Sequence, residues 1–136
     1  MTDWIIPPGV DEADLTKFAG FTYLITNLTT GRAYVGQKVL KEKKHGKVRH
    51  DLWRRYFGSC TELKEDVAAL GPDNFRREIL TLCKTRPLMN YEETREMFAR
   101  NVLYARLPDG SRAFYNGHIM NRFRPSKVAA MLQVGA

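Results

Sequence analysis

The stretch GFTYLITNLTTGRAYVGQ, residues 20–37, carries the pattern that decides the fold. Phe21, Tyr23 and Ile25 occupy alternate positions in its first half, and a period of two with aromatic and β-branched residues is typical of a β-strand. The segment NLTTG has the composition of a turn, and RAYVGQ resumes a β-like pattern. The sequence therefore predicts a hairpin with Tyr23 and Tyr34 on adjacent strands.

The residues after position 58 predict a helix followed by a strand. Ser59 and Glu62 have the spacing of a capping box, and the apolar residues after them recur at helical intervals until Gly71 and Pro72 stop the helix. Residues 75–83, FRREILTLC, form a strand-like apolar run. We expect this third strand to pair with the hairpin.

A second helix is predicted to end near Tyr104. Its start has two candidates: Thr85, which is followed by a proline in the first turn, and Asn90, which has a glutamate three residues later. Residues 112–119 are expected to form either a last short strand or an irregular segment that closes over the site. The apolar stripe of the helix is assigned to Tyr91, Phe98 and Val102, with Met97 nearby.

Composition limits the class of protein. The 136 residues are 43% hydrophobic, enough for one compact domain, and 22 Lys and Arg against 15 Asp and Glu give a net charge of +7, which favours nucleic acid as a partner. No apolar run reaches the roughly 20 residues that span a bilayer, and the first ten residues lack signal-peptide features. We therefore expect no membrane partner and a cytoplasmic location. Cys60 and Cys83 lack paired spacing, which predicts reduced thiols and no zinc site.

Most of the net positive charge lies between residues 38 and 55. Residues 38–50 show no periodicity, which predicts a long, mobile loop with a function. Trp53 and Tyr56 offer stacking surfaces beside the cations, although a place in the core suits Trp53 as well. The predicted DNA contacts are Lys38, Lys41, Lys43, Lys44, Lys47, Arg49, Arg54 and Arg55.

An ordered series of motifs resembles the GIY-YIG endonucleases. Tyr23 stands eleven residues before the triplet Tyr34-Val35-Gly36, although the first triplet, Phe21-Thr22-Tyr23, departs from the family pattern except at its tyrosine. The continuation resembles small phage-type members, homing endonuclease-like, so that the resemblance covers residues 18–119. Its later motifs are Tyr56-Phe57-Gly58-Ser59, Gly71-Pro72-Asp73-Asn74-Phe75, Glu93 and Tyr115-Asn116.

The resemblance implies an α/β (α+β) chain with the GIY-YIG nuclease fold, a small three-stranded antiparallel sheet flanked by helices. It also implies a DNA endonuclease, encoded by a phage or mobile element, with one Mg²⁺ (or Mn²⁺) per active site and duplex DNA as partner. Whether one protomer or a homodimer acts on the duplex stays open. The predicted division is an acidic arm (1–17), a nuclease domain (18–120) and a basic tail (121–136). The alternative function is a basic nucleic-acid-binding module that keeps the scaffold but does not cut.

Phosphodiester hydrolysis needs a nucleophile, a base, and charge that stabilises the transition state and the leaving 3′ oxygen. The resemblance assigns Glu93 as the metal ligand, with Glu92 as alternative, since carboxylate oxygens suit a hard cation. Tyr23 is expected to act as general base or to position the water, and Lys38 is expected to favour its phenolate. Tyr34 would share the site by hydrogen bonding.

An arginine that binds the scissile phosphate completes the implied site. Arg54 and then Arg55 are the preferred candidates, and Arg49 is a third. His50 is either a proton acceptor or an ordinary surface histidine. Asn116 matches the family's late asparagine, which would orient the metal site or a phosphate, and its alternative role is to form a turn.

Overall fold

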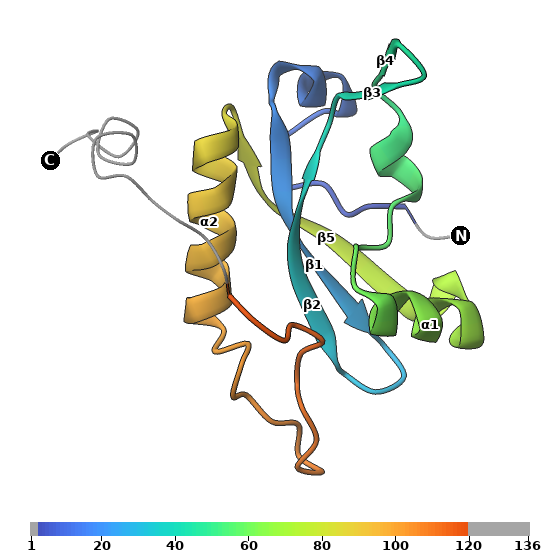
Figure 1. The fold of residues 1–136 in the computed structure, drawn as a ribbon, viewed down its shortest axis with the longest axis vertical. Helices are drawn as coiled ribbons and strands as arrows, with labels where there is room; N and C mark the ends of the chain where they lie inside the picture. Colours follow the sequence, from blue (N-terminus) through green and yellow to red (C-terminus); the bar gives the residue numbers. More distant parts are fainter. Residues whose placement is uncertain (1–2, 120–136) are drawn as a thin grey trace, which may run out of the picture.

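A three-stranded antiparallel sheet forms the centre of the structure, a computed structural model that describes residues 3–119. The strand β1 (Gly20–Asn27) lies between β2 (Ala33–Val39) and β5 (Phe75–Cys83), as Figure 1 shows. In the register of the hairpin, Tyr23 lies opposite Gly36. The predicted hairpin, the third strand and the α/β (α+β) class with a small antiparallel sheet are confirmed.

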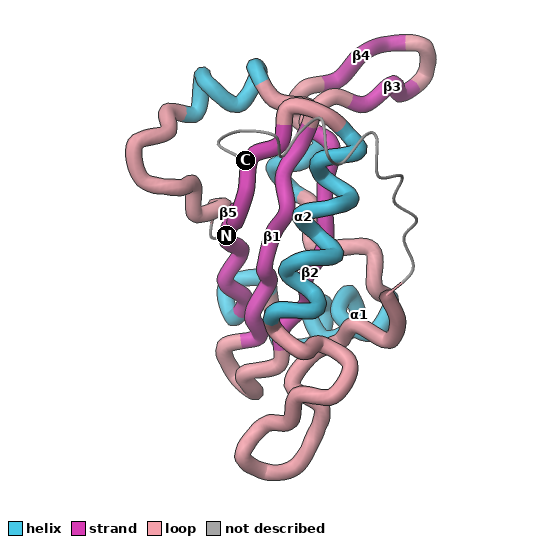
Figure 2. Tube along the Cα trace, turned by 90° about the vertical axis from the view of Figure 1, so that its left-hand side faces the viewer, coloured by secondary structure: helices cyan, strands magenta, loops and turns pink. Residues whose placement is uncertain are grey.

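The two faces of the sheet are covered by different elements. The helix α2 (Arg86–Ala99) lies along one face, while α1 (Thr61–Leu70) and the short 3-10 helix η2 (Leu52–Arg55) lie on the other (Figures 1 and 2). Leu24 of β1 packs against the small cluster on the α2 face. The alternation in the sequence therefore separates the face covered by α2 from an aromatic face.

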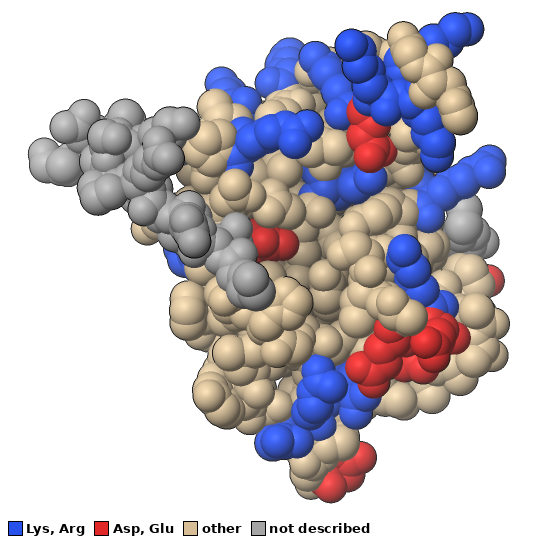
Figure 3. Space-filling view, in the orientation of Figure 1, with Lys and Arg blue, Asp and Glu red and all other residues tan. Residues whose placement is uncertain are grey.

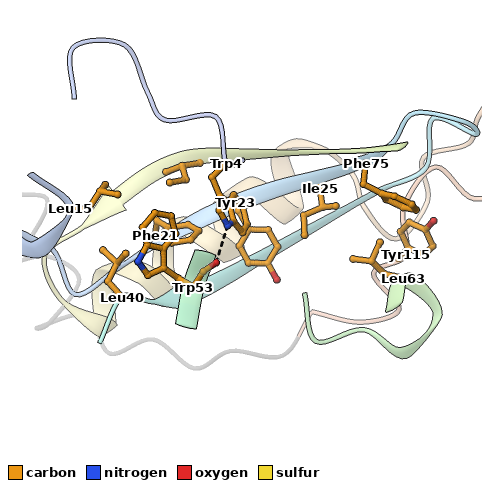
Figure 4. Packing of buried hydrophobic residues seen from close by; sticks show 11 residues of the cluster. Trp4, Leu15, Phe21, Tyr23, Ile25, Leu40, Trp53, Leu63, Phe75 and Tyr115 are labelled. Atoms are coloured by element: carbon orange, nitrogen blue, oxygen red, sulfur yellow. Dashed lines mark hydrogen bonds between the residues drawn. The ribbon is translucent and has the colours of Figure 1, made fainter. Parts of the chain in front are cut away.

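The aromatic face holds the larger core. Phe21, Tyr23 and Ile25 are buried there beside Trp4 and Trp53 (Figure 4). The indole N–H of Trp4 donates to the main-chain oxygen of Trp53 at 2.9 Å. Because Trp53 is only 4% exposed, its side chain is a core residue and does not offer a surface on which a base can stack.

The segment predicted as an N-terminal arm packs onto the domain. Trp4 is buried, and the main chain of Ile5 bonds to Arg77 and Ile79 of β5 at 2.8 and 2.9 Å. A 3-10 helix, η1 (Glu12–Lys17), follows and buries Leu15. The predicted tail, residues 121–136, lies outside the described residues.

The expectation that residues 38–50 form an irregular loop is wrong. This segment continues β2 and then forms a small hairpin of β3 (Glu42–Lys44) and β4 (Lys47–Arg49). At its tip His45 and Gly46 both have positive φ values, 53° and 77°, as required by the tight turns that match strand twist. The turn, and not a buried apolar face, specifies the hairpin.

Both helix starts differ in detail from the sequence patterns. The cap of α2 is Thr85, whose side chain accepts from the Leu88 N–H, so Asn90 is excluded as its start. Cys60 caps α1 without a side-chain hydrogen bond, so the predicted capping box of Ser59 and Glu62 is wrong. The short 3-10 helix η3 (Pro72–Asn74) then leads into β5.

The end and the apolar stripe of α2 also differ from the prediction. The helix ends at Ala99, not near Tyr104, and Asn101 has a positive φ of 54° just beyond it. Phe98 is 67% exposed, whereas Met89 and Met97 are buried. Val102 of the predicted stripe and Met97 beside it do face the sheet.

The segment after α2 returns to the sheet as irregular chain. Its main chain bonds to Ala33 from Ala113 and Tyr115, at 2.9 and 2.8 Å. This places Tyr115 and Asn116 beside the outer edge of β2. Within residues 3–119, no helix is long and apolar enough to cross a membrane.

Candidate functional site

A cavity of about 430 Å³ wraps around the outer edge of β2. Tyr34 reaches it from the aromatic face, Gln37 from the α2 face, and residues 115–118 close it from outside. Its lining consists of Tyr34, Gln37, Ser59, Cys60, Glu93, Met97, Tyr115, Asn116, Gly117 and His118. Chain segments far apart in the sequence therefore meet at one strand edge.

Glu93 is the carboxylate that α2 presents to this cavity. Its side chain is buried, at 9% exposure, and Gln37 Nε2 donates to Glu93 Oε1 at 3.2 Å and to Asn90 Oδ1 at 2.7 Å. The neighbouring glutamates are engaged elsewhere, because Glu92 pairs with Arg95 at 2.8 Å. Between the two carboxylates considered from the sequence, the geometry favours Glu93.

The donor set fits a hydrated hard cation better than a tightly caged metal. Among residues 3–119, no group of three or more His, Cys, Asp or Glu side chains is placed to hold a metal ion. Mg²⁺ commonly binds through one or two carboxylates and keeps several waters. A single, oriented carboxylate at Glu93 with open space beside it is compatible with that mode.

The two tyrosines are neighbours but differ in access. Their ring centroids lie 6.1 Å apart, and Tyr23 is 1% exposed whereas Tyr34 is partly exposed and lines the cavity. Burial raises the pKa of Tyr23 well above its ordinary value, with Tyr56 and Tyr34 adding to the effect. Burial also raises the pKa of Tyr34, against the lowering effect of Ser59. Both phenols are therefore protonated at neutral pH.

Gly36 is the residue that lets Tyr23 lie flat against β2. A Cβ at position 36 would overlap the hydroxyl and ring of Tyr23, which faces it across the hairpin. Gly58 has a φ of +89° and its added Cβ would come within 2.9 Å of Leu63 and 3.5 Å of the Tyr23 hydroxyl. The packing of the Tyr23 phenol thus explains Gly36, whereas Gly58 is explained by its positive φ and by the closeness of Leu63.

Lys38 does not have the effect on Tyr23 that we expected. Its ammonium lies 4.3 Å from the ring centroid of Tyr56 and pairs with Glu42 at 3.0 Å. Since the pKa of Tyr23 is raised and not lowered, the expectation of a phenolate favoured by Lys38 is wrong. Lys38 instead lines a second cavity, further along β2.

The three candidate arginines lie away from the lining of the first cavity as the described residues define it. Arg54 stacks over Trp53 at 4.7 Å, pairs with Glu12, and lines a separate cavity beside the N-terminal segment. Arg49 forms a two-bond pair with Asp51, at 2.8 and 2.7 Å. Arg55 and His50 are exposed in the same region.

Arg77 of β5 is a buried arginine that the sequence did not single out. Its Nη1 donates to the main-chain oxygens of Arg54 and Tyr56, at 3.0 and 2.8 Å. Burial lowers the pKa of Arg77 to about 10. These contacts hold in place the segment that contains Tyr56, whose ring lies against Lys38. Arg77 therefore supports the site without lining a cavity.

Asn116 fixes the wall of the first cavity. Its amide bonds to both main-chain groups of Val35, with Val35 N–H donating to Oδ1 at 3.0 Å and Nδ2 donating to Val35 O at 2.8 Å. Tyr115 adds a 2.6 Å hydrogen bond from its hydroxyl to Asp66 of α1. These contacts give Asn116 a positioning role, beyond the turn former considered from the sequence.

Four lining residues were missed by the sequence reading: Gln37, Ser59, Cys60 and His118. The period of two gave a signal for Gln37, since it lies two residues after Val35 and so on the α2 face. Ser59 was assigned to a cap, but its hydroxyl lies 3.3 Å from the Tyr34 hydroxyl. Nothing in the spacing of Cys60 or His118 indicates their place here.

Charge is distributed unevenly over the face that contains the edge of β2. Lys and Arg side chains gather over the β3–β4 end of the molecule, whereas an acidic patch lies over α1 (Figure 3). The exposed side chains of the hairpin include Lys43, Lys44 and Lys47. The cavity that contains Glu93 therefore lies apart from the main concentration of positive charge.

One comparison with known proteins identifies a family. A family model described as "Putative endonuclease segE, GIY-YIG domain" matches residues 4–119. No curated protein and no solved structure matches the chain.

Proposed function

The chain belongs to the GIY-YIG endonuclease family, and we propose that it is a metal-dependent DNA endonuclease that hydrolyses phosphodiester bonds beside the edge of β2. The observation that carries the proposal is that Glu93 and Tyr34, from two different elements, line one cavity. The cavity is large enough for a phosphate group and its waters. Tyr34, Glu93 and Asn116 have hydrogen-bond partners within the protein before any ligand binds.

Glu93 would hold the cation, and Gln37 would orient its carboxylate through the 3.2 Å hydrogen bond. A divalent ion such as Mg²⁺ or Mn²⁺ supplies positive charge for the leaving 3′ oxygen and favours deprotonation of a water. Glu93 is nearly buried, so its attraction for a cation is less weakened by solvent than that of a surface carboxylate.

The protonated tyrosines are assigned to hydrogen-bond donation. Tyr34 would donate from its hydroxyl to a phosphate oxygen or to the attacking water. Tyr23, which is almost fully buried, would hold Tyr34 in place by packing. The proton of the water would pass to His118, since an imidazole is the side chain that most often accepts protons in catalysis and His118 lines the same cavity.

Duplex DNA is the proposed substrate, bound by the basic end of the molecule. Phosphate neutralisation by Lys and Arg supplies the sequence-independent part of DNA affinity. The side chains that we assign to it are Lys38, Lys41, Lys43, Lys44, Lys47, Arg49, Arg54 and Arg55. Arg54 and Arg55 are thereby proposed as DNA contacts and not as groups at the scissile phosphate.

The test is a cleavage assay on a supercoiled plasmid with Mg²⁺ or Mn²⁺. We expect nicking that is lost in EDTA and falls about 100-fold or more in Glu93→Gln, because the one acidic side chain that residues 3–119 contribute to the cavity lining would be neutralised. Glu92→Gln is the matched control, because it removes the same charge from the adjacent residue of α2. Loss of cutting in Glu92→Gln but not in Glu93→Gln would overturn the assignment of the ligand.

The alternative is a module that binds DNA without cutting it. Binding of the plasmid with no cleavage under either metal would favour that alternative and would contradict the proposed reaction. Both functions use the basic end of the molecule to bind DNA, so the salt dependence of binding does not distinguish a nuclease from a binding module.

A further inference from the structure

The second cavity on the edge of β2 lies next to the first and shares one lining residue with it. It has a volume of about 350 Å³ and is lined by Gln37, Lys38, Val39, Tyr56, Arg86, Met89 and Asn90. Gln37 lines both cavities. Its Nε2 donates to Glu93, which lines the first cavity, at 3.2 Å, and to Asn90, which lines the second cavity, at 2.7 Å.

The two cavities have opposite charge. Glu93 is the acidic residue that lines the first cavity. The charged residues that line the second cavity are Lys38, from β2, and Arg86, from the start of α2. Within residues 3–119, Arg86 has no ion-pair partner, so no carboxylate of this part of the chain neutralises its charge. Cations from two elements that converge on one cavity are suited to bind a phosphate.

The order of these cavities along β2 matches a continuous path. Tyr34, Gln37 and Lys38 follow one another along the strand, and β2 leads into the basic β3–β4 hairpin (Figure 1). At roughly 3.3 Å per residue, Tyr34 and Lys38 are about 13 Å apart along β2. A DNA strand rises about 3.4 Å per nucleotide, so a few nucleotides cover this distance. One DNA strand could therefore occupy both cavities.

We propose that Lys38 and Arg86 form a subsite that binds a second phosphate of the cleaved strand, next to the cavity that contains Glu93. This inference rests on the proposed function for the identity of its ligand, a nucleic-acid phosphate. It assigns Arg86, which lies on none of the recognised motifs, to substrate binding. Arg86 would thus take a part of the role that was expected of Arg54.

Glu42 competes with the phosphate for Lys38. Its carboxylate holds the Lys38 ammonium at 3.0 Å over the ring of Tyr56. A bound phosphate must share Lys38 with this carboxylate or displace it. Removal of the Glu42 charge should therefore strengthen binding, in the direction opposite to the loss of Arg86.

The first experiment measures the affinity for a short fluorescent DNA duplex in EDTA over a range of salt concentrations. Arg86→Gln should weaken binding about fivefold and reduce the slope of log affinity against log salt by about one. Arg86→Lys should retain most of the slope. The matched control is Arg106→Gln, an exposed arginine in the loop after α2, which should change neither quantity. Equal effects of Arg86→Gln and Arg106→Gln would overturn the subsite, as would no effect of either.

The second experiment compares Glu42→Gln with Glu65→Gln, an exposed carboxylate on α1. Affinity should rise about twofold to fivefold in Glu42→Gln and by less in Glu65→Gln. Equal increases would show only a general effect of net charge and would contradict a competition for Lys38.

Failure of the subsite and failure of the proposed reaction are distinguishable, because the binding measurements need neither metal nor cleavage. Cutting by the wild-type protein together with unchanged affinity of Arg86→Gln would overturn the subsite alone. Loss of affinity in Arg86→Gln, with no cutting by the wild type under either metal, would overturn the reaction alone.

Discussion

The cavity that contains Glu93 and the β3–β4 hairpin lie on the same side of the molecule but are built differently. In the cavity, Tyr34, Gln37 and Asn116 each have a hydrogen-bond partner within the protein. On the hairpin, Lys43 and Lys47 extend into solvent. Groups that are fixed before binding favour the chemical step, because they need no reorganisation when charge develops, whereas exposed cations add affinity that salt can screen.

Because the lysines of the hairpin are exposed, we expect their substitution to weaken DNA binding and to leave the rate of the chemical step unchanged. Triple substitution of Lys43, Lys44 and Lys47 by Gln should weaken DNA binding about 100-fold at about 0.1 M salt or below, and should flatten the salt dependence. The cleavage rate on saturating DNA should stay unchanged. Titrations at several salt concentrations and single-turnover cleavage measure the two quantities.

The control for the hairpin carries the same loss of charge on other surfaces: Lys17, Lys64 and Arg106 replaced by Gln. A similar loss of affinity in this control would mean that net charge, and not the hairpin, determines binding.

The next largest effect is expected at Gly36, where the cavity depends on packing. Gly36→Ala should lower the free energy of unfolding by about 2 kcal/mol, because the new methyl group overlaps the Tyr23 ring. Cleavage should fall as well, since Tyr23 supports Tyr34. Chemical denaturation measures the stability.

The cause can be checked in a Tyr23→Leu background, in which the overlapping ring is absent. There the cost of Gly36→Ala should be clearly smaller. An undiminished cost would show that the backbone, and not the phenol, requires glycine at this position.

The two tyrosines should separate a contact with substrate from a packing role. Tyr34→Phe should lower the cleavage rate roughly tenfold, the value of one hydrogen bond to a charged group, with little change in DNA affinity. Tyr23→Phe should have a smaller effect on the rate, because its hydroxyl is buried. Single-turnover rates compare them, and the reverse order would place Tyr23 at the reacting group.

The smallest effect concerns stability in alkali. Burial, helped by the hydrogen bond to Asp66, raises the pKa of Tyr115 from its ordinary value of 10.0 to about 12. The unfolded chain therefore loses this proton first, and the free energy of unfolding should fall as pH rises from 10 toward 12. Tyr115→Phe should make the fall less steep, as measured by urea denaturation at pH 9 and pH 11. If the free energy of unfolding falls as steeply in Tyr115→Phe as in the wild type, groups other than Tyr115 cause the fall.

The parts of the fold that were predictable depend on local patterns. The alternation of Phe21, Tyr23 and Ile25 follows from burial of one face, and Thr85 with a following proline is a local helix start. The β3–β4 hairpin was missed because all residues of β4 are exposed, so burial imposes no period of two on it. Phe98 was misassigned because α2 ends early and buries Met97 instead.

The site was predictable only in part because its contacts are long-range. Glu93 came from the ordered motifs, but the partner of Arg54 is Glu12, 42 residues away, and no spacing rule connects them. The raised pKa of Tyr23 likewise results from burial by several segments. Gln37 directly follows the Tyr34-Val35-Gly36 motif and Arg86 lies outside the motifs, so both are identified only by the cavities that they line.

The hydrogen bonds of Asn116 also have a consequence for the behaviour of the protein at high concentration. An uncovered outer strand can pair with a strand of another molecule and start aggregation. Here the Asn116 amide takes the place of a peptide group opposite Val35, and Ala113 and Tyr115 bond to Ala33. At the other margin of the sheet, Ile5 bonds to β5 in the same way. The segments that close the cavity and complete the core therefore also protect both margins of a small sheet from self-association.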